Sequence, residues 1–229
     1  MNFSILTDIE GTTSSLRFVK EVLFPYAREK LRPFLRDHAR HPVVIEAIRD
    51  IENQMGGPLS ILECSNILES WIDQDVKATS LKAIQGLIWE EGYTLGNFEG
   101  HIYPDAAISL RRWHQDGIPL YVFSSGSVQA QKLLFGHTSE GDLTSLFSAF
   151  FDTTTGPKLQ ATSYLEIARK IDRPPEEILF LSDIEGELDA ALEAGLKTIQ
   201  LVRDSASPAS LRHPVASSFS EIDPATLFS

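Results

Sequence analysis

The tetrapeptide Asp-Ile-Glu-Gly occurs twice in the chain, at Asp8–Gly11 and at Asp183–Gly186, and each copy follows a short apolar run. Carboxylates placed after strand-like runs could bind a divalent cation or exchange protons with a substrate. The segments that follow the two copies, GTTSSLRF and ELDAALEA, do not match beyond the tetrapeptide. A duplication would carry more matching residues, so we interpret the two copies as halves of one site.

The two acidic segments supply Asp8, Glu10, Asp183, Glu185 and Glu187 as candidate oxygen ligands. Carboxylates that crowd together raise one another's pKa unless a cation neutralises them. Mg²⁺ suits such hard oxygen ligands and usually takes one or two carboxylates together with water and substrate phosphate. The alternative is solvated loop or helix-start charges, because acids are favourable in a first helical turn. That alternative suits Glu185 and Glu187 well, but it suits Asp8 less, since Asp8 directly ends an apolar run.

A candidate anion site lies in the segment YVFSSGSVQAQ, Tyr121–Gln131. An apolar run leads into Ser124, Ser125 and a glycine before a helical pattern begins, and small hydroxyls with backbone N–H groups at a helix N-terminus bind anions. An ordinary serine N-cap is the alternative interpretation. No lysine follows in the P-loop pattern, so the segment does not indicate a nucleotide-binding P-loop.

Lys158 lies in the segment TTTGPKLQATSY, in a Gly-Pro loop just before a helical pattern. A lone loop lysine is usually solvated. Beside two carboxylate loops and an anion-binding turn, however, Lys158 would supply the positive charge that the other residues of such a site do not provide. An aspartate nucleophile, Mg²⁺, a serine turn and a lysine together indicate phosphoryl transfer to aspartate followed by hydrolysis.

Short, nearly continuous apolar runs alternate with helical patterns along most of the chain. The predicted strands are Phe3–Leu6, Leu120–Phe123, Ile178–Leu181 and Thr198–Val202, with a shorter one at Phe150–Asp152. The predicted helices are Pro104–His114, Val128–Phe135, Ala161–Ile171 and Leu188–Ala194. This alternation predicts an α/β fold with a doubly wound parallel sheet, in which ligands collect outside the carboxyl ends of the strands. From Asp204 onward we expect an extended tail that packs through Phe219 and Leu227.

Residues 16–98 differ from the rest because they contain helical spacing and no strand-like run. One apolar stripe comprises Val44, Ala47, Ile48, Ile51 and Met55, and another comprises Leu81, Ile84, Leu87 and Ile88. We therefore predict a helical domain at 16–98, inserted into a core formed by 1–15 and 99–229. Its stripes are typical of the core of a helix bundle, and the insert as a whole could act as a lid.

The composition argues against several classes of partner. Lys+Arg 20 against Asp+Glu 32 gives a net charge of −12 among 229 residues, which disfavours nucleic acid and anionic membranes. An anionic substrate therefore needs a local cation. The one cysteine, Cys64, is expected to be buried, and it favours a reducing cytoplasm. No apolar run approaches the ~18 residues of a membrane span, the N-terminal stretch does not resemble a secretory leader, and we expect a monomer.

The candidate residues resemble the four motifs of the haloacid dehalogenase-like superfamily, in order and spread over most of the chain. Asp8 with Glu10 resembles the first motif, Ser124 the second, Lys158 the third, and Asp183 with Glu187 the fourth. The helical insert is similar to the type-one cap of that superfamily. One departure is the glutamate at position 10, where the usual phosphatase has aspartate two residues after its nucleophile. Its longer side chain implies that the carboxyl group reaches a different proton.

Longer strings resemble the enolase-phosphatase family of methionine salvage. They are DIEGTT, FVKEVLFPY (Phe18–Tyr26), SSGSVQAQKLLFGHT (Ser124–Thr138) with the following EGDL, and FDTT (Phe151–Thr154). The resemblance implies a phosphatase that also enolises its substrate, 2,3-diketo-5-methylthiopentyl 1-phosphate, before phosphate is removed to give the acireductone.

The same resemblance implies residue roles. Asp8 would be the nucleophile and a ligand of one Mg²⁺ per chain, and Asp183 a further ligand. Glu10 would bind the metal through its backbone carbonyl while its carboxylate moves protons. Ser124 and Ser125 would hold phosphate, which Lys158 would neutralise.

Other interpretations stay open. A phosphatase of the same superfamily could act on another small phosphate ester. A receiver-like domain, which accepts phosphate without turnover, would expect an acid after the middle strand, where Tyr121–Phe123 leads into serines. A binding protein without catalysis is disfavoured because every required residue type is present.

Overall fold

The computed structural model describes residues 3–74, 76–203 and 209–228. It divides into two compact units: one is Arg17–Glu99, and the other comprises the segments on either side of it. The first, the helical unit, is a continuous stretch of chain. The second, the core unit, contains the sheet and all the candidate site residues.

The core unit is built on a six-stranded parallel sheet in the order β3-β2-β1-β4-β5-β6. The strands are β1 (Ser4–Thr7), β2 (Leu120–Phe123), β3 (Phe147–Phe151), β4 (Ile178–Ser182), β5 (Lys197–Leu201) and β6 (Val215–Ala216). Every residue of β1 and β4 is buried, because helices cover both faces of the sheet. The predicted fold class is confirmed, and the five predicted strands lie within a few residues of their observed positions.

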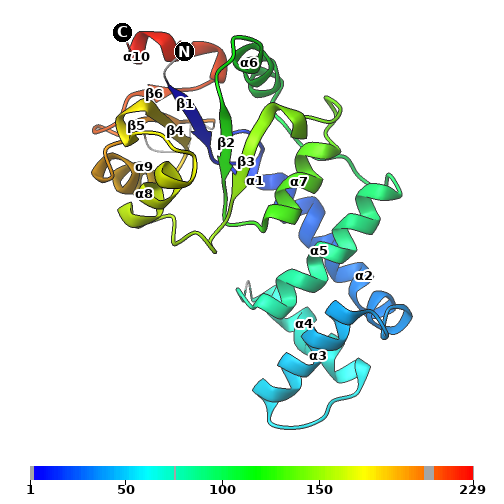
Figure 1. Cartoon of the computed structure of the whole chain (residues 1–229). Coiled ribbons are helices and arrows are strands. Elements are labelled where there is room, and N and C mark those ends of the chain that lie inside the picture. Colours follow the sequence, from blue (N-terminus) through cyan, green and yellow to red (C-terminus); the bar gives the residue numbers. More distant parts are fainter. Residues whose placement is uncertain (1–2, 75, 204–208, 229) are drawn as a thin grey trace. The chain divides into compact units, whose positions relative to one another are not determined.

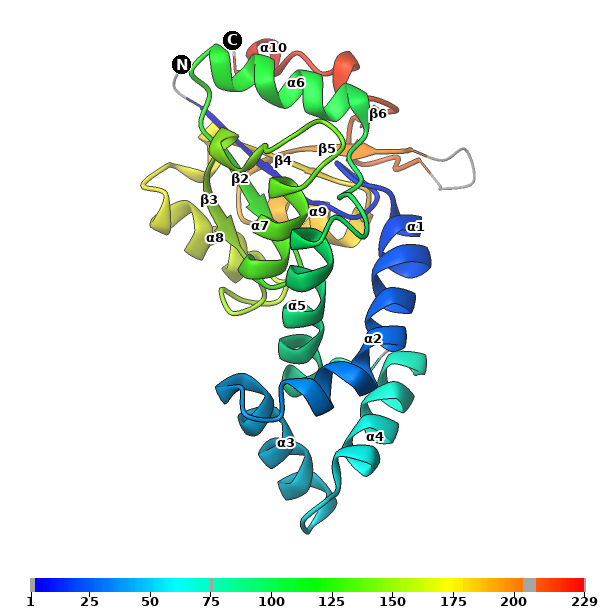
Figure 2. The ribbon, with the colours of Figure 1, turned by 90° about the vertical axis from the view of Figure 1, so that its right-hand side faces the viewer.

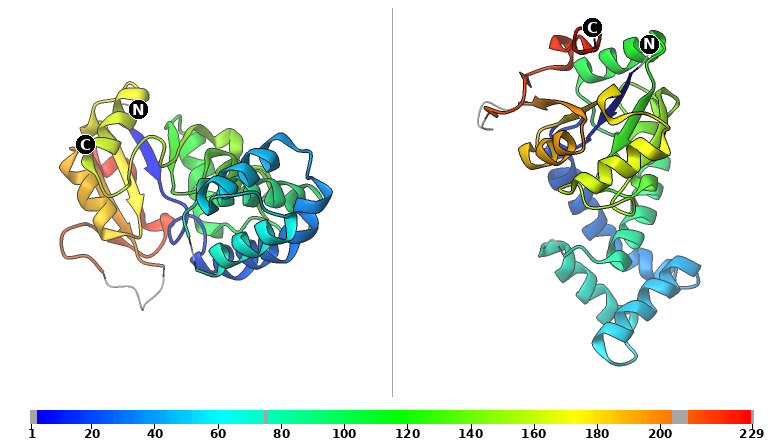
Figure 3. Two further views of the ribbon diagram at one scale, coloured as in Figure 1. Left: turned by 90° about the horizontal axis from the view of Figure 1, so that it is seen from below. Right: turned by 60° about the vertical axis from the view of Figure 1, so that its left-hand side comes forward.

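The helices of the core unit are α6 (Pro104–Gln115), α7 (Val128–Gly136), α8 (Ala161–Lys170), α9 (Glu185–Glu193) and the short α10 (Pro224–Leu227). Helices α8 and α9 cover one face of the sheet, while α6 and α7 lie on the other (Figures 1 and 3). Apolar side chains of α8 and α9 pack on the strands there, with Phe123, Tyr164 and Phe180 at the centre. Gly117 and Gly195, with φ of 75° and 94°, follow the last turns of α6 and α9.

The path of the chain through the sheet places the two acidic segments side by side. From β1 the chain runs outward to β3 and then returns to β4, so β1 pairs with both β2 and β4. Thr7 is level with Leu181 in that register, and the Asp8 amide donates to the Leu181 carbonyl at 2.9 Å. A reversal of strand order of this kind opens a crevice at the carboxyl ends.

The helical unit is a bundle of helices (Figure 2). Its interior is apolar. Its elements are α1 (Leu16–Phe18), the π-helix η1 (Val19–Leu23), α2 (Phe24–Asp37), α3 (Pro42–Met55), α4 (Ile61–Asp73) and α5 (Thr79–Thr94). Helix α2 packs on α4 and α5, and α3 packs on α5. Cys64 is fully buried, as predicted, and α4 begins with a capping box between Ser60 and Glu63.

The C-terminal part of the core unit is more structured than predicted. The expected tail begins at 204–208, which lie outside the described residues, and it continues into β6, a 3-10 turn at Phe219–Glu221 and α10. Phe219 is fully buried beside Trp113, and Leu227 is half-buried. The prediction of a plain extended tail was wrong, because short pairing with β5 orders this segment. No helix within the described ranges is long and apolar enough to cross a membrane.

Candidate active site

A tight turn follows β1. The amides of Thr12, Thr13 and Ser14 all donate to the carbonyl of Ile9, at 3.1, 2.9 and 2.8 Å. Gly11 sits in the left-handed region at φ 75°, which a glycine adopts at little cost. The chain therefore folds back on itself directly after Asp8 and fixes the main chain around that aspartate.

The two copies of the acidic tetrapeptide are in contact at this turn. A Cβ built on Gly11 would lie 2.2 Å from Oδ2 of Asp183, so the carboxylate rests against the bare glycine. The amide of Asp183 also donates to Oγ1 of Thr12 at 3.0 Å. The structure thus brings the copies together, as one shared site requires. The glycine of the other copy, Gly186, instead lies in the first turn of α9.

Lys158 joins two buried carboxylates. Its Nζ lies 2.6 Å from Oδ1 of Asp8 and 2.6 Å from Oε2 of Glu187, and the three side chains are 8%, 6% and 11% exposed. Ser182 donates its hydroxyl to the same Glu187 oxygen at 3.0 Å, and the Tyr164 hydroxyl donates to the Lys158 carbonyl at 2.8 Å. Removing either partner of a buried pair leaves an uncompensated charge, so this arrangement is fixed tightly.

Burial and mutual repulsion raise the pKa of two of these acids. Burial, followed by the negative charge of Asp8, raises the pKa of Asp183 to about 7. The same two causes raise the pKa of Glu187 to about 7, against the opposing effect of Lys158. Burial by itself lowers the pKa of Lys158, but the charges of Asp8 and Glu187 outweigh it and the pKa rises. The lysine is therefore cationic, but its charge does not offset the burial and the repulsion that raise the pKa of Asp183.

The residues present fit a divalent cation. Oδ1 of Asp183 is buried and has no hydrogen-bond partner. An ion beside Asp8 and Asp183 would satisfy that oxygen and remove the repulsion between the two carboxylates. Within the described ranges no three His, Cys, Asp or Glu side chains form a ligand cluster.

The backbone of Asp183 is held while its carboxylate oxygen is left unpaired. Gln200, on β5, donates its amide to the Asp183 carbonyl at 3.1 Å, and the next amide, of Ile184, donates to the Ser182 hydroxyl at 3.1 Å. Groups that hold a ligand without touching the ion tune the affinity for metal. Sequence reasoning missed Gln200 and Thr12, although both lie near the carboxyl ends of the strands, where ligands collect.

Ser124 and Ser125 lie at the carboxyl end of β2, next to β1. Ser124 is buried, and its hydroxyl accepts the amide of Gly126 at 3.3 Å, while Ser125 is exposed. The N-cap of α7 is Ser127, whose hydroxyl accepts the Ala130 amide at 3.2 Å. The N-cap interpretation thus applies to Ser127 and not to Ser124 or Ser125.

The remaining acids divide between two surroundings. Glu10 is half-buried in the turn after β1, where its backbone bridges to Ser14. Glu185 points elsewhere and accepts the Ser210 hydroxyl at 2.6 Å, a hydrogen bond that lowers its pKa. Glu185 and Glu187 both lie in the first turn of α9, as the helix-start alternative expects. The expectation of a solvated charge was wrong for Glu187, because Glu187 is buried against Lys158.

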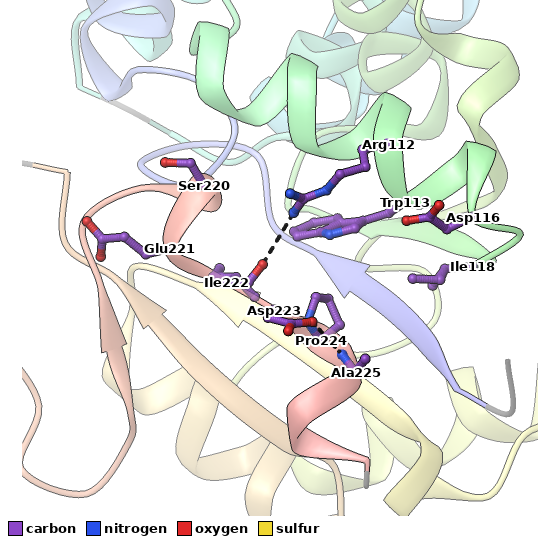
Figure 4. A pocket seen from close by; sticks show the side chains of 10 residues that line it. All are labelled: Arg112, Trp113, Asp116, Ile118, Ser220, Glu221, Ile222, Asp223, Pro224 and Ala225. Atoms are coloured by element: carbon purple, nitrogen blue, oxygen red, sulfur yellow. Dashed lines mark hydrogen bonds between the residues drawn. The ribbon is translucent and has the colours of Figure 1, made fainter.

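A cavity of about 340 Å³ lies elsewhere in the core unit (Figure 4). Its lining residues come from the end of α6 and from the C-terminal segment, and include Arg112, Trp113 and Asp223. Ile118, which also lines it, precedes β2. The cavity therefore lies at the amino ends of the strands, whereas Asp8 lies at their carboxyl ends.

Known proteins match this chain over nearly its full length. Residues 5–195 match the model of the haloacid dehalogenase-like hydrolases. The chain is 54% identical to enolase-phosphatase E1 of Alcanivorax borkumensis, over 96% of this chain and 97% of the relative. It is 55% identical to enolase-phosphatase E1 of Methylococcus capsulatus, over 98% and 99% of the two chains.

Solved structures show the same fold. The UTR4 protein of Saccharomyces cerevisiae superposes with a TM-score of 0.82 at 31% identity, covering 97% of this chain and all of the yeast chain. CbbY of Rhodobacter sphaeroides, in complex with phosphate, superposes with a TM-score of 0.61 at 19% identity and full coverage of both chains. The second likeness concerns the fold alone.

Proposed function

Because this chain belongs to the enolase-phosphatase E1 family of the haloacid dehalogenase-like hydrolases, we propose that it converts 2,3-diketo-5-methylthiopentyl 1-phosphate to the acireductone 1,2-dihydroxy-3-keto-5-methylthiopentene and phosphate, in methionine salvage. The observation that carries this proposal is the buried pairing of Lys158 with Asp8, a carboxylate fixed at the carboxyl end of the central strand. Such a carboxylate is a nucleophile held in place for phosphoryl transfer.

Asp8 attacks phosphorus with one carboxylate oxygen, and the enol oxygen of the substrate leaves. Lys158 holds Oδ1 of Asp8 at 2.6 Å and offsets the charge of the phosphate group. Water then cleaves the acyl phosphate and restores the carboxylate. Ser124 and Ser125, at the end of the neighbouring strand, hold the phosphate oxygens, and Glu187 keeps the lysine in position.

Glu10 is assigned the proton transfers, because it lies in the turn directly after Asp8 and its carboxylate extends one methylene beyond an aspartate. In the enolisation it takes the carbon-bound proton while negative charge develops on the adjacent oxygen. In the phosphatase step it gives a proton to the leaving oxygen and later accepts one from water.

The family generally uses a divalent metal, and the assignment here is one Mg²⁺ held by Asp8, the backbone carbonyl of Glu10 and Asp183. The support is the buried, unpaired Oδ1 of Asp183 and the repulsion between the two aspartates. When bound, Mg²⁺ neutralises charge that develops on the phosphate group and on the enolate.

Members of this family act on small phosphate substrates. The helical insert, residues 16–98 in the predicted division, is assigned the role of the cap domain, because it follows the first motif directly. The net charge of −12 and the lone buried cysteine support a cytoplasmic monomer without nucleic acid or membrane partners. Light scattering of the purified protein tests the monomer.

The experiment that tests the function mixes purified protein, Mg²⁺ and the diketo phosphate, and records the ultraviolet spectrum and free phosphate together. Enediol absorbance accompanied by phosphate supports both half-reactions in one chain. Phosphate without an enol signal would leave an ordinary phosphatase and remove the enolisation role of Glu10. No change in either signal, from folded protein with metal bound, would overturn the substrate.

A further inference from the structure

Arg203 lies just beyond the carboxyl end of β5, and its side chain is 8% exposed. Its Nε donates to the carbonyl of Thr12 at 2.9 Å, and its Nη1 donates to Oδ2 of Asp105, on the first turn of α6, at 2.7 Å. The guanidinium also lies 4.3 Å from the centre of the Tyr103 ring. The arginine is thus fixed by a carboxylate, an aromatic face and a main-chain carbonyl.

Thr12 connects this arginine to the candidate metal site. Its carbonyl accepts from Arg203, and its hydroxyl, which is completely buried, accepts from the amide of Asp183 at 3.0 Å. The preceding residue, Gly11, is the one against which the Asp183 carboxylate rests. A continuous path of hydrogen bonds therefore runs from Asp105 through Arg203 and Thr12 to Asp183.

We propose that Arg203 is a positioning residue for the divalent cation, acting through Thr12 on Asp183. By holding the Thr12 carbonyl, Arg203 fixes the turn that follows β1. That turn then fixes the backbone of Asp183 through the Thr12 hydroxyl, and its carboxylate through Gly11. Partners of this kind set the orientation of a ligand and so its affinity for metal. This inference deepens the proposed function. It rests on one part of that function, the binding of a divalent cation at the site.

The chemistry of the side chain supports this role. A guanidinium offers five N–H donors in a rigid plane, so its Nε and Nη1 can reach a carbonyl and a carboxylate together, whereas a lysine is a compact point charge. Nη2 of Arg203 is buried without a hydrogen-bond partner. An unpaired buried donor costs stability, which counts against a role of this arginine in stability alone.

A purely structural role is the competing explanation. Asp105 also accepts from the amide of Phe219 at 2.8 Å and from the hydroxyl of Ser218 at 3.0 Å, so the Asp105–Arg203 pair could serve to tie down the C-terminal segment. That role predicts lower stability and an unchanged affinity for metal. The two roles are therefore separated by measuring both quantities.

The experiment compares wild type, Arg203→Met and Arg203→Lys. Binding of Mg²⁺ in the absence of substrate is measured by titration calorimetry, and stability by urea denaturation. We expect Arg203→Met to weaken Mg²⁺ binding by about 10–100-fold, the usual effect of removing an outer partner of a ligand. Arg203→Lys should recover part of the loss, because it keeps one charged donor. Phosphate release at saturating Mg²⁺ should change by less than about threefold.

Arg173→Met is the matched control, since Arg173 is half-buried in the same unit and pairs with Glu177 at 3.1 Å, within the segment between α8 and β4. It should leave Mg²⁺ affinity unchanged. Lower stability of Arg203→Met with wild-type Mg²⁺ affinity would overturn the proposal and leave the structural tie.

If Arg203→Met does not fold, Thr12→Val tests the path from Arg203 to Asp183 instead. It keeps the carbonyl that Arg203 holds and removes the hydroxyl that reaches Asp183, so it should weaken Mg²⁺ binding to a similar degree. Unchanged binding in Thr12→Val would overturn the path from Arg203 to Asp183. Wild type that binds Mg²⁺ but releases no phosphate from the diketo phosphate contradicts the proposed function alone, and leaves the role of Arg203 standing.

Discussion

The core unit and the helical unit bury different kinds of side chain. The helical unit fills its interior with apolar groups around Leu31, Ile51 and Leu68, and among its described residues the buried polar ones are neutral. The core unit buries Asp8, Lys158 and Glu187, together with the hydroxyls and amides that surround them. Apolar packing is insensitive to the protonation and metal content of the solution, whereas buried charges are not.

This difference indicates which unit governs stability through packing and which governs chemistry and metal binding. A substitution in the helical unit should change stability through lost packing. A substitution among the buried charges should change chemistry and metal binding as well as stability, because it also leaves a buried charge without its partner. Four predictions test this contrast, in order of expected effect.

The largest effect is expected for Asp8→Asn. The amide is close in size to the carboxylate but is not a nucleophile, so phosphate release should fall by about 10⁴-fold or more. Release is measured at saturating Mg²⁺, beside circular dichroism to verify folding. Asp116→Asn, at an exposed aspartate of the same unit, is the control and should be fully active. Turnover near the wild-type rate in Asp8→Asn would remove the nucleophile.

The second prediction concerns packing in the helical unit. Leu31 is completely buried on α2, so Leu31→Ala should lower the free energy of unfolding of that unit by about 2–5 kcal/mol. Urea denaturation followed by circular dichroism measures the loss, and Mg²⁺ binding to the core unit should stay at the wild-type value.

Leu62→Ala is its matched control, because Leu62 lies on α4 of the same unit and is 55% exposed. It should cost less than about 0.5 kcal/mol. Equal losses in the two variants, or a loss of Mg²⁺ affinity in Leu31→Ala, would contradict the separation of the two units.

The third prediction uses the two glycines of the repeated tetrapeptide. Gly11→Ala puts a methyl group 2.2 Å from Oδ2 of Asp183 and strains a φ of 75°, so the turn must shift and Mg²⁺ binding should weaken by about tenfold or more. Gly186→Ala is the internal control. It lies in the first turn of α9, where its new methyl group meets the exposed Leu159 at 3.2 Å.

Calorimetry with Mg²⁺ measures the affinity of both variants. Alanine suits a helix better than glycine by up to about 1 kcal/mol, so Gly186→Ala should bind Mg²⁺ normally and be as stable as wild type or slightly more stable. Equal affinities in the two glycine variants would show that the contact between the two acidic segments does not govern metal binding.

The smallest effect is a dependence of stability on pH without metal. The pKa of Asp183 rises from 3.8 to about 7 on folding, chiefly through burial, so between these values the folded chain holds more protons than the unfolded one. The contribution of Asp183 to stability is therefore complete below pH 4 and is lost as pH rises toward 7. Mg²⁺ binds the ionised carboxylate, so it should stabilise the protein more at pH 8 than at pH 5.

Thermal unfolding at pH 5, 6, 7 and 8, with chelator and with Mg²⁺, measures both trends. Other carboxylates have lowered pKa values and change stability in the opposite direction, among them Asp105 and Glu185. Asp183→Asn isolates the effect, because it should lose less stability than wild type between pH 5 and pH 7. Parallel profiles for the two proteins would show that Asp183 is ionised in the folded state throughout.

The sequence predicted the sheet well because its strands are buried on both faces and therefore apolar throughout. Leu120–Phe123 was predicted residue for residue. The carboxyl ends of those strands then located the acidic segments, the serine turn and Lys158. β6 was missed because two residues carry no periodic pattern.

Sequence reasoning could not find the residues that support the site. Thr12, Gln200 and Arg203 act through hydrogen bonds between segments that are distant in sequence, and no local pattern encodes such pairs. For Glu187 the local signal was misleading, because an acid in the first turn of a helix is usually solvated. Here the turn faces Lys158 and buries the acid.

The pairing of β1 also bears on how the chain folds. Ser4 lies beside Ile178, and Ile5 beside Leu120, so the first strand made during synthesis has its partners in segments made much later. The helical unit, in contrast, finds all the contacts of its own core within Arg17–Glu99. Loop closure over long separations is slow, and unpaired strand edges are prone to aggregate. The helical unit should therefore acquire its structure early, while Asp8 reaches the site only after the last parallel strands have been made.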